Sequence, residues 1–488
     1  MTERELMEVA VEAVELAESL GVEYADCRAV ARRSEEVSVK NEAPEGIRRS
    51  EEAGLGVRVL VDGAWGFSAS GLVRVEEARR VVERALEIAK ASAKVRRERV
   101  GLAPSVVVPG GRYETPLKRD PFLVPLEEKL ALLIEATSRM AKEPSVKVRR
   151  AVFRAYEERK FFASTEGSRI YQRIVHCGGG IEATAVDEGD TQTRSYPASH
   201  GGNYAASGWE FFESLRLPEE AERVASEAVA LLKADPCPEG ETTLILGPAQ
   251  LALQIHESCG HPSELDRVLG TETSFAGTSF LTLDKLGRFK YGSEEVNIVA
   301  DATLDLGLGT FGFDDEGVPA SRFYLVREGT FCGYLSDRES ARKAGLEGST
   351  GCARADGWQR IPLVRMTNIS LEPGEAGTLE DLISDTRKGI LMETNRSWSI
   401  DDLRLNFQFG CEIAWEIRRG RRARLLKNPV YMGITPEFWR SCDAVCGPSE
   451  WRLFGLLNCG KGEPLQLMHV GHGASPARFR KVKVGAGR

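Results

Sequence analysis

A hairpin signal near the N-terminus places the narrowest limit on how this chain can fold. Two apolar runs, GVRVLV and AWGFSAS, meet at Asp62-Gly63. Asp-Gly readily adopts the positive backbone angles of a two-residue turn, so the two runs should pair as antiparallel strands. Similar signals recur at TEGS, at DEGD and in the downstream runs FYLVREGTFCGYL, EIAWEIRRGRRARLL and LQLMHVGHG. The chain should therefore be rich in antiparallel sheet.

Helical patterns alternate with these strands mainly in the first half. Leu6, Val9, Ala13, Leu16 and Leu20 recur at helical spacing. Further amphipathic helices are expected from about residue 75, in LEEKLALLIEATSRMAK and in PEEAERVASEAVALLKA. We therefore predict an α+β fold. Its N-terminal half has helices on an antiparallel sheet, and its C-terminal half is mostly antiparallel β with one helix, beginning at Pro248, packed on it.

The length of the chain favours more than one domain. A chain of 488 residues exceeds what one hydrophobic core usually serves. Prolines cluster between residues 100 and 124, and DPCPEGETT interrupts the pattern near residues 235–243. We predict α+β subdomains at 1–100 and 101–235 and a β-rich domain at 236–488.

Composition limits the partners of the chain. The net charge of −8 disfavours nucleic acid, and the basic hairpin at 418–427 is read as a solvated turn or an interface. No stretch approaches the roughly 20 apolar residues of a membrane span. The N-terminus has no apolar run of the signal-peptide type, and the ten scattered cysteines do not resemble a disulfide framework. A cytoplasmic protein is expected.

The stretch HESCGH holds two of the six histidines of the chain, His256 and His261, with Glu257 directly after the first. Five residues turn a regular helix by ~500°, which places the two histidines ~140° apart. A one-residue π-bulge, or an end to the helix at Gly260 just before Pro262, would bring them together. The spacing is therefore compatible with a metal site.

A catalytic zinc ion takes three protein ligands, so two histidines are not enough. The residues leave the third ligand open: Glu264, Asp266, or a distant Cys or His. Cys459, in LLNCGKGEPLQ, is one candidate, and we expect it in a loop because glycines and a lysine flank it. In peptidases with an adjacent glutamate, that residue takes a proton from the attacking water.

Several separated motifs together resemble a known family. HESCGH and the distant NCGKG, with GTFGFDDEGVPA, GYLSDRESARKAG and LVRMTNISLEPG between them, are similar to the TldD/PmbA family of metallopeptidases, in its zinc-bearing TldD type. The resemblance implies that His256, His261 and Cys459 bind Zn²⁺ and that Glu257 is the general base. It also implies an α+β fold with a β-rich C-terminal domain, and unfolded or leader-type peptides bound as an added strand in a closed chamber.

Other residues receive weaker interpretations. His469 and His472 follow Cys459 closely and could reach the site, whereas a family glutamine stands later than usual, at Gln466. Arg365 could bind a substrate carboxylate, stabilise an oxyanion or form a structural ion pair. Asp314 and Asp315, in a glycine-rich loop, could attract a substrate N-terminus. The run VHCGGGIEA is interpreted as a turn or bulge, because no helix follows to form a phosphate loop.

These observations favour a zinc-dependent peptidase in which zinc activates water and Glu257 takes its proton. The alternatives are a non-catalytic peptide-binding adaptor subunit, which would bind peptide without turnover, and a small-molecule amidohydrolase, which would need a narrow pocket. A symmetric homodimer is the simplest assembly, and the family resemblance also implies a heterodimer with a PmbA/TldE-type paralogue.

Overall fold

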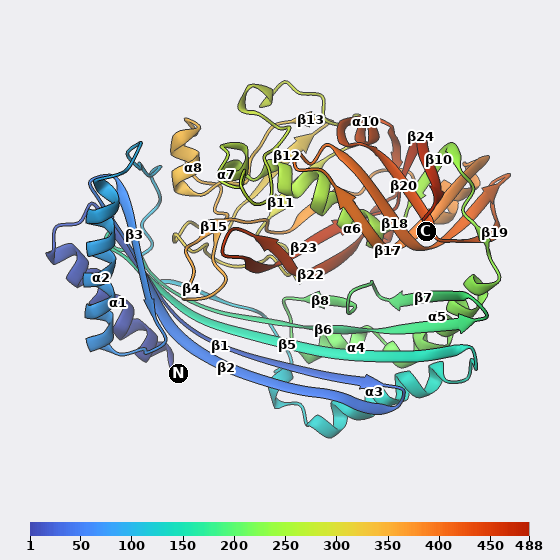
Figure 1. The fold of residues 1–488 in the computed structure, drawn as a ribbon, viewed down its shortest axis with the longest axis horizontal. Helices are drawn as coiled ribbons and strands as arrows, with labels where there is room; N and C mark the ends of the chain where they lie inside the picture. The colour runs from blue at the N-terminus through green and yellow to red at the C-terminus, as the bar shows by residue number, and fades with distance from the viewer. Residues whose placement is uncertain (488) are drawn as a thin grey trace.

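A long curved sheet forms the first half of the molecule in the computed structural model, which describes residues 1–487. Its strand order is β3-β2-β1-β5-β6-β4, with β7 and β8 also paired to β6, and every pairing except β4–β6 is antiparallel. Figure 1 shows the sheet sweeping beneath the C-terminal half. The strands are β1 (Tyr24–Lys40), β2 (Ala43–Val61), β3 (Ala64–Ser70), β4 (Gly111–Glu114), β5 (Val146–Ser164), β6 (Arg169–Asp187), β7 (Asp190–Tyr196) and β8 (Asn203–Ala205).

Helices cover this sheet in two separate groups. α1 and α2 pack against β1–β3 at one end, and α3 and α5 pack against β5 and β6 at the other. Each group buries its own apolar cluster, as expected for helices with one apolar face. The helices are α1 (Glu3–Ser19), α2 (Val75–Ala93), α3 (Leu126–Met140), α4 (Trp209–Ser214) and α5 (Leu217–Leu232).

The second half is built around another sheet of eight strands. Its order is β17-β10-β24-β20-β18-β19-β9, with β21 paired to β24. Four further strands form the sheet β13-β12-β11-β16, and β14–β15 and β22–β23 are separate antiparallel pairs. One large apolar cluster lies between these sheets and α6. Among residues 1–487, no helix combines the length and apolarity needed to cross a membrane.

The elements of this half have the following bounds. The strands are β9 (Asp235–Pro236), β10 (Gly240–Leu246), β11 (Ile298–Asp301), β12 (Arg322–Arg327), β13 (Thr330–Phe331), β14 (Ala353–Arg354), β15 (Leu363–Val364), β16 (Ile369–Leu371), β17 (Lys388–Ile400), β18 (Asn406–Arg418), β19 (Arg421–Lys427), β20 (Pro429–Ile434), β21 (Cys442–Val445), β22 (Arg452–Lys461), β23 (Gln466–Ala474) and β24 (Ala477–Ala486). The helices are α6 (Pro248–Ile255), α7 (Leu265–Val268), α8 (Arg338–Lys343), α9 (Leu379–Ser384) and α10 (Thr435–Arg440).

The predicted α+β class and the hairpin at Asp62-Gly63 are confirmed. The turn or bulge predicted at VHCGGGIEA is wrong, because residues 175–183 lie in the middle of β6 in unbroken pairing with β5. A Cβ on Gly178 would come within 2.1 Å of the Asn203 carbonyl oxygen, so the glycine serves the close approach of β8. The first sheet runs continuously past residue 100, and the division there stays a prediction.

Candidate metal centre

The end of α6 brings the two predicted histidines onto one face. α6 passes at His256 into a π-helical turn, His256–Gly260, and the His261 N–H donates to the His256 carbonyl five residues back. That bond widens the helix by one residue, which offsets the mismatch that spacing of five creates on a regular helix. Of the two distortions that the spacing left open, the structure shows the π-bulge.

The turn is held by groups around it. A Cβ on Gly260 would lie 2.0 Å from the sulfur of Met366, so only glycine fits there without displacement. The Tyr291 hydroxyl donates to the Ser258 carbonyl at 2.7 Å, and the indole N–H of Trp439 donates to the Ser258 hydroxyl at 3.0 Å. The first bond gives a backbone carbonyl of the turn a partner, and the second holds the Ser258 side chain in place.

Cys459 reaches the histidines from β22, not from the predicted loop. Leu456 faces Val470 across the β22–β23 pair, and a bulge then shifts the register so that Cys459 faces Met468. Without the extra residue Cys459 would face Leu467, whose side chain points outward and is 46% exposed. The bulge therefore turns the thiol into the core.

The three side chains form one buried cluster. Ligand atoms of His256, His261 and Cys459 all lie within 4.8 Å of one another. The Cys459 sulfur and the His261 Nε2 are 3.7 Å apart, close to the roughly 3.6 Å that tetrahedral zinc with standard Zn–S and Zn–N lengths would require. The donor set and its spacing therefore fit a zinc ion.

Hydrogen bonds fix which nitrogen of each histidine is free. The carbonyl of Ile369 can only accept, so the His472 Nδ1, 3.0 Å away, must donate to it. The neutral His472 ring then accepts at Nε2 from the His256 Nδ1, 2.8 Å away. The lone pair of His256 is left on Nε2. Similarly, the His261 Nδ1 lies 2.9 Å from the Glu264 carboxylate, which leaves the His261 Nε2 free.

Electrostatics favour the forms of these residues that bind metal. Burial lowers the pKa values of His256 and His261, which keeps both rings neutral. Burial alone would raise the pKa of Cys459, but Arg365 and His261 outweigh it, so the pKa of the thiol lies below its ordinary value. Neutral imidazoles and a thiolate are what a metal ion requires.

Glu257 has one strong partner, which sequence reasoning missed. Its carboxylate accepts from Arg404 at 2.6 Å, and Glu257 is 6% exposed. Arg404 lies between β17 and β18 with φ of 62°, and its carbonyl accepts from the Thr435 hydroxyl at 2.9 Å. No motif surrounds Arg404 in the sequence, and 147 positions separate it from Glu257. Only the fold could reveal this pair.

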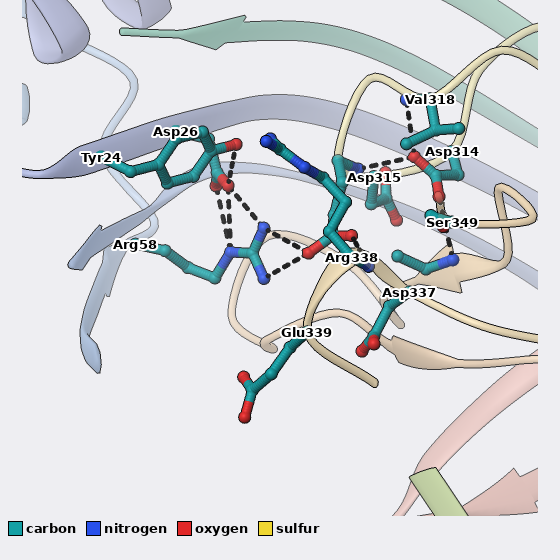
Figure 2. A network of polar contacts seen from close by, with 12 residues as sticks. Tyr24, Asp26, Arg58, Asp314, Asp315, Val318, Asp337, Arg338, Glu339 and Ser349 are labelled. Atoms are coloured by element: carbon teal, nitrogen blue, oxygen red, sulfur yellow. Dashed lines mark hydrogen bonds and ion pairs between the residues drawn. The ribbon is translucent and has the colours of Figure 1, made fainter. Parts of the chain in front are cut away.

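The remaining predicted residues are not among the three that form the metal cluster. Arg365 is fully buried and donates to the backbone carbonyls of Gln466 and Cys459. Asp314 accepts from the N–H groups of Glu316 and Val318 (Figure 2). Its roles in substrate binding, like those of Arg365, stay predictions.

Asp315 and His469 line a cavity next to the long sheet. The Asp315 carboxylate pairs with Lys160 at 2.5 Å, and the His469 Nδ1 lies 2.8 Å from the His176 Nδ1. Both border a cavity of about 360 Å³ between the β22–β23 pair and the long sheet, together with Leu457. His469 faces this cavity, whereas His472, three residues on, faces His256.

The chain is similar to known proteins over nearly its whole length. Family models match at residues 25–89 (PmbA/TldA metallopeptidase domain 1), 119–233 (central domain) and 239–486 (C-terminal domain). A metalloprotease of Methanocaldococcus jannaschii is 32% identical over 93% of this chain and 96% of its own length. A zinc metalloprotease TldD homolog of Saccharolobus solfataricus is 22% identical over 97% of this chain and 98% of its own.

A solved structure has the same fold. TldE from Thermococcus kodakarensis matches with a TM-score of 0.72 and 18% identity, over 97% of this chain and 98% of that chain.

Proposed function

This chain belongs to the PmbA/TldA metallopeptidase family, and we propose that it is a zinc-dependent peptidase that hydrolyses unfolded or leader-type peptides. Its protease activity follows from the family. The observation that carries the rest of the proposal is that ligand atoms of His256, His261 and Cys459 lie within 4.8 Å of one another.

These three residues would hold the zinc ion. Their ligand atoms lie within 4.8 Å of one another, and the Nδ1 atoms of the two histidines are engaged by His472 and Glu264. Zinc bound there would supply Lewis-acid chemistry, polarising a carbonyl and making a water molecule more acidic. The name of the Saccharolobus relative supports zinc as the metal.

Glu257 would act as the general base. It lies inside the π turn, directly after His256, and its carboxylate would take a proton from the attacking water. Arg404 donates to this carboxylate at 2.6 Å and holds it in place. Arg404 would thus be a positioning residue for the base.

A peptide would bind as an added strand along β22. Within residues 1–487 no strand pairs with β22 on the side opposite β23. Asn203 of β8 bonds the Leu453 carbonyl and the Gly455 N–H there, so the stretch left for a peptide is the one around Asn458 and Gly460, which are exposed beside Cys459. An extended peptide on that edge would use its backbone N–H and C=O groups, which tolerates many sequences. The cavity of about 360 Å³ beside Leu457 offers room for its side chains.

The proposal also includes a partner subunit and a cellular compartment. The fold of TldE supports pairing with a TldE-type paralogue, and a homodimer is the simpler alternative. All ten cysteines are free thiols, which supports a reducing compartment such as the cytoplasm. No contact at the cluster favours the second candidate, a peptide-binding adaptor without catalysis.

Elemental mass spectrometry of the purified protein tests the proposal. We expect about one zinc per chain, and its loss in His256→Ala and in Cys459→Ser. Glu257→Gln should keep the zinc and lower hydrolysis of a denatured protein substrate at least ~100-fold, because it removes the base and not a ligand.

Two outcomes would contradict this assignment. Zinc retained in Cys459→Ser would exclude the thiol as a ligand. A wild-type protein that binds peptide but contains no metal after zinc-supplemented purification would favour the adaptor.

A further inference from the structure

One long edge of the first sheet is unpaired. β3 pairs only with residues Leu55–Val61 of β2, and no strand among residues 1–487 pairs with Ala43–Gly54 on that side. Residues 47–52 are all exposed, and Figure 1 shows this part of β2 at the border of the sheet. Open edges present free N–H and C=O groups, and natural proteins usually cover or protect them.

The same five residues, RRSEE, occur in β1 and in β2, at 32–36 and at 48–52. Inside the chain the two copies pair antiparallel about their central serines, whose hydroxyls are 2.7 Å apart. Arg49 lies 3.4 Å from Glu35, and Arg48 lies 3.8 Å from Glu36. The charge order of RRSEE reverses about its serine, so the segment is complementary to itself in antiparallel pairing.

The second copy of this segment keeps unused charge on the open edge. Arg48 and Arg49 are 84% and 61% exposed. Glu51 and Glu52 face Arg33 and Arg32 in the register, but those arginines pair with other acids, and within residues 1–487 neither glutamate forms an ion pair. Two free carboxylates and two exposed guanidinium groups thus lie along one unpaired edge.

We propose that a second copy of this chain covers this edge, by antiparallel pairing of β2 with β2 about a two-fold axis at Ser50. In that register Arg48 faces Glu52 of the other copy, Arg49 faces Glu51, and the exposed Ile47 faces Ala53. Opposite residues share a face in an antiparallel pair, so all four ion pairs can form. The contact is isologous, as a closed dimer requires.

The alternative is that these charges keep other strands away, as charged residues on edges often do. A protective edge needs charge of one sign, or isolated charges, to repel an approaching copy. The RRSEE order does the opposite, because the antiparallel approach of an identical strand places each charge next to its opposite. The pairing of β1 with β2 already contains this arrangement.

Charge reversal in two complementary variants tests the proposal. Arg48→Glu/Arg49→Glu makes the segment wholly acidic, and Glu51→Arg/Glu52→Arg makes it wholly basic, so each variant alone should weaken the dimer roughly 100-fold in sedimentation velocity. Mixing the two should restore the dimer, because every pair across the axis is then opposite in charge. Recovery on mixing also shows that both variants fold.

The control is Arg96→Glu/Arg97→Glu, which changes two adjacent exposed arginines beyond α2 by the same charge. It should leave the dimer unchanged. Zinc content should stay at the wild-type value in all of these variants, so a failure of this interface is distinguishable from a failure of the proposed zinc site.

Two cysteine variants test where the two-fold axis lies. Residues facing each other in an antiparallel pair have Cα atoms about 4.5–5.5 Å apart, within the range a disulfide spans. Ser50→Cys should therefore form a covalent dimer under mild oxidation. Ile47→Cys should not, because the two copies of residue 47 would be about 20 Å apart.

Three results would overturn the proposal. The first is that the wild-type chain is monomeric at all concentrations. The second is that each charge-reversed variant still forms the dimer on its own. The third is that Ser50→Cys and Ile47→Cys cross-link to the same extent.

Discussion

At the scale of single residues, the candidate metal centre depends on histidines held in one tautomer. The Ile369 carbonyl, His472 and His256 form a directed chain in which each ring donates from Nδ1. A His256 ring without that chain could rotate or place its proton on Nε2, and either change removes a donor for the metal. His472 is therefore expected to act through His256 and not through the substrate.

His472→Ala should lower the zinc affinity of the protein about 10–100-fold, because the ring of His256 loses the bond that orients it. Competition with a fluorescent zinc chelator measures this affinity directly. The matched control is His469→Ala, since His469 lies on the same strand but faces the cavity beside His176. Equal losses in the two variants would mean that His472 has no special role.

At the scale of elements, two local irregularities build the cluster. The π turn after α6 aligns His256 with His261, and the bulge in β22 turns Cys459 inward. Both insert one residue into a regular repeat, in a helix and in a strand. Such insertions change the direction of a side chain without changing the rest of the element.

The sequence predicted the first irregularity but not the second. A spacing of five between the histidines, with Gly260 and Pro262 beside them, is a local signal that a helix must be distorted. The bulge has no such signal, because the register of β22 is decided by its partner β23. The same holds for Arg404, which meets Glu257 only through the fold, and for Gly178, whose need for glycine comes from β8.

Asp337 gives a prediction at the scale of one helix. It caps α8 by accepting from the Ser340 N–H at 2.7 Å, and burial, with Glu316 and Asp266 nearby, raises its pKa to about 7. The folded state therefore prefers the protonated carboxyl. The stability that this preference contributes is full below pH ~4, where the unfolded chain also holds the proton, and is lost as pH rises through about 7.

Asp337→Asn keeps the cap, because Asn and Asp cap helices about equally well, and removes the titration. The free energy of unfolding should rise by about 2 kcal/mol at pH 8 and stay unchanged at pH 4. The rise at pH 8 is about half of what the pKa shift of a wholly buried group would give, because the Asp337 side chain is partly exposed. Urea unfolding at the two pH values measures it. A variant less stable than wild type at pH 8 would show that the ionised carboxylate is needed.

At the scale of the whole molecule, ion pairs formed by buried arginines join the long sheet to the C-terminal half. Arg58 on β2 lies between Asp26 on β1, at 2.5 Å, and Glu316 beyond β11, at 3.3 Å (Figure 2). Arg338 at the start of α8 pairs with Glu166 in the turn after β5, at 2.7 Å. These contacts set the position of the sheet relative to the cavity and the β22–β23 pair.

Arg58→Ala should lower the free energy of unfolding by about 3–5 kcal/mol, because Asp26 and Glu316 would remain buried without their counter-charge. Arg79→Ala is the control: Arg79 pairs with Glu12 at 2.6 Å but is 60% exposed, so its loss should cost less than about 1 kcal/mol. Urea unfolding followed by tryptophan fluorescence measures both variants. If the two losses are equal, the network of Arg58 contributes no more to stability than a surface pair does, and the other contacts between the two halves, such as Lys160 with Asp315, must hold them together.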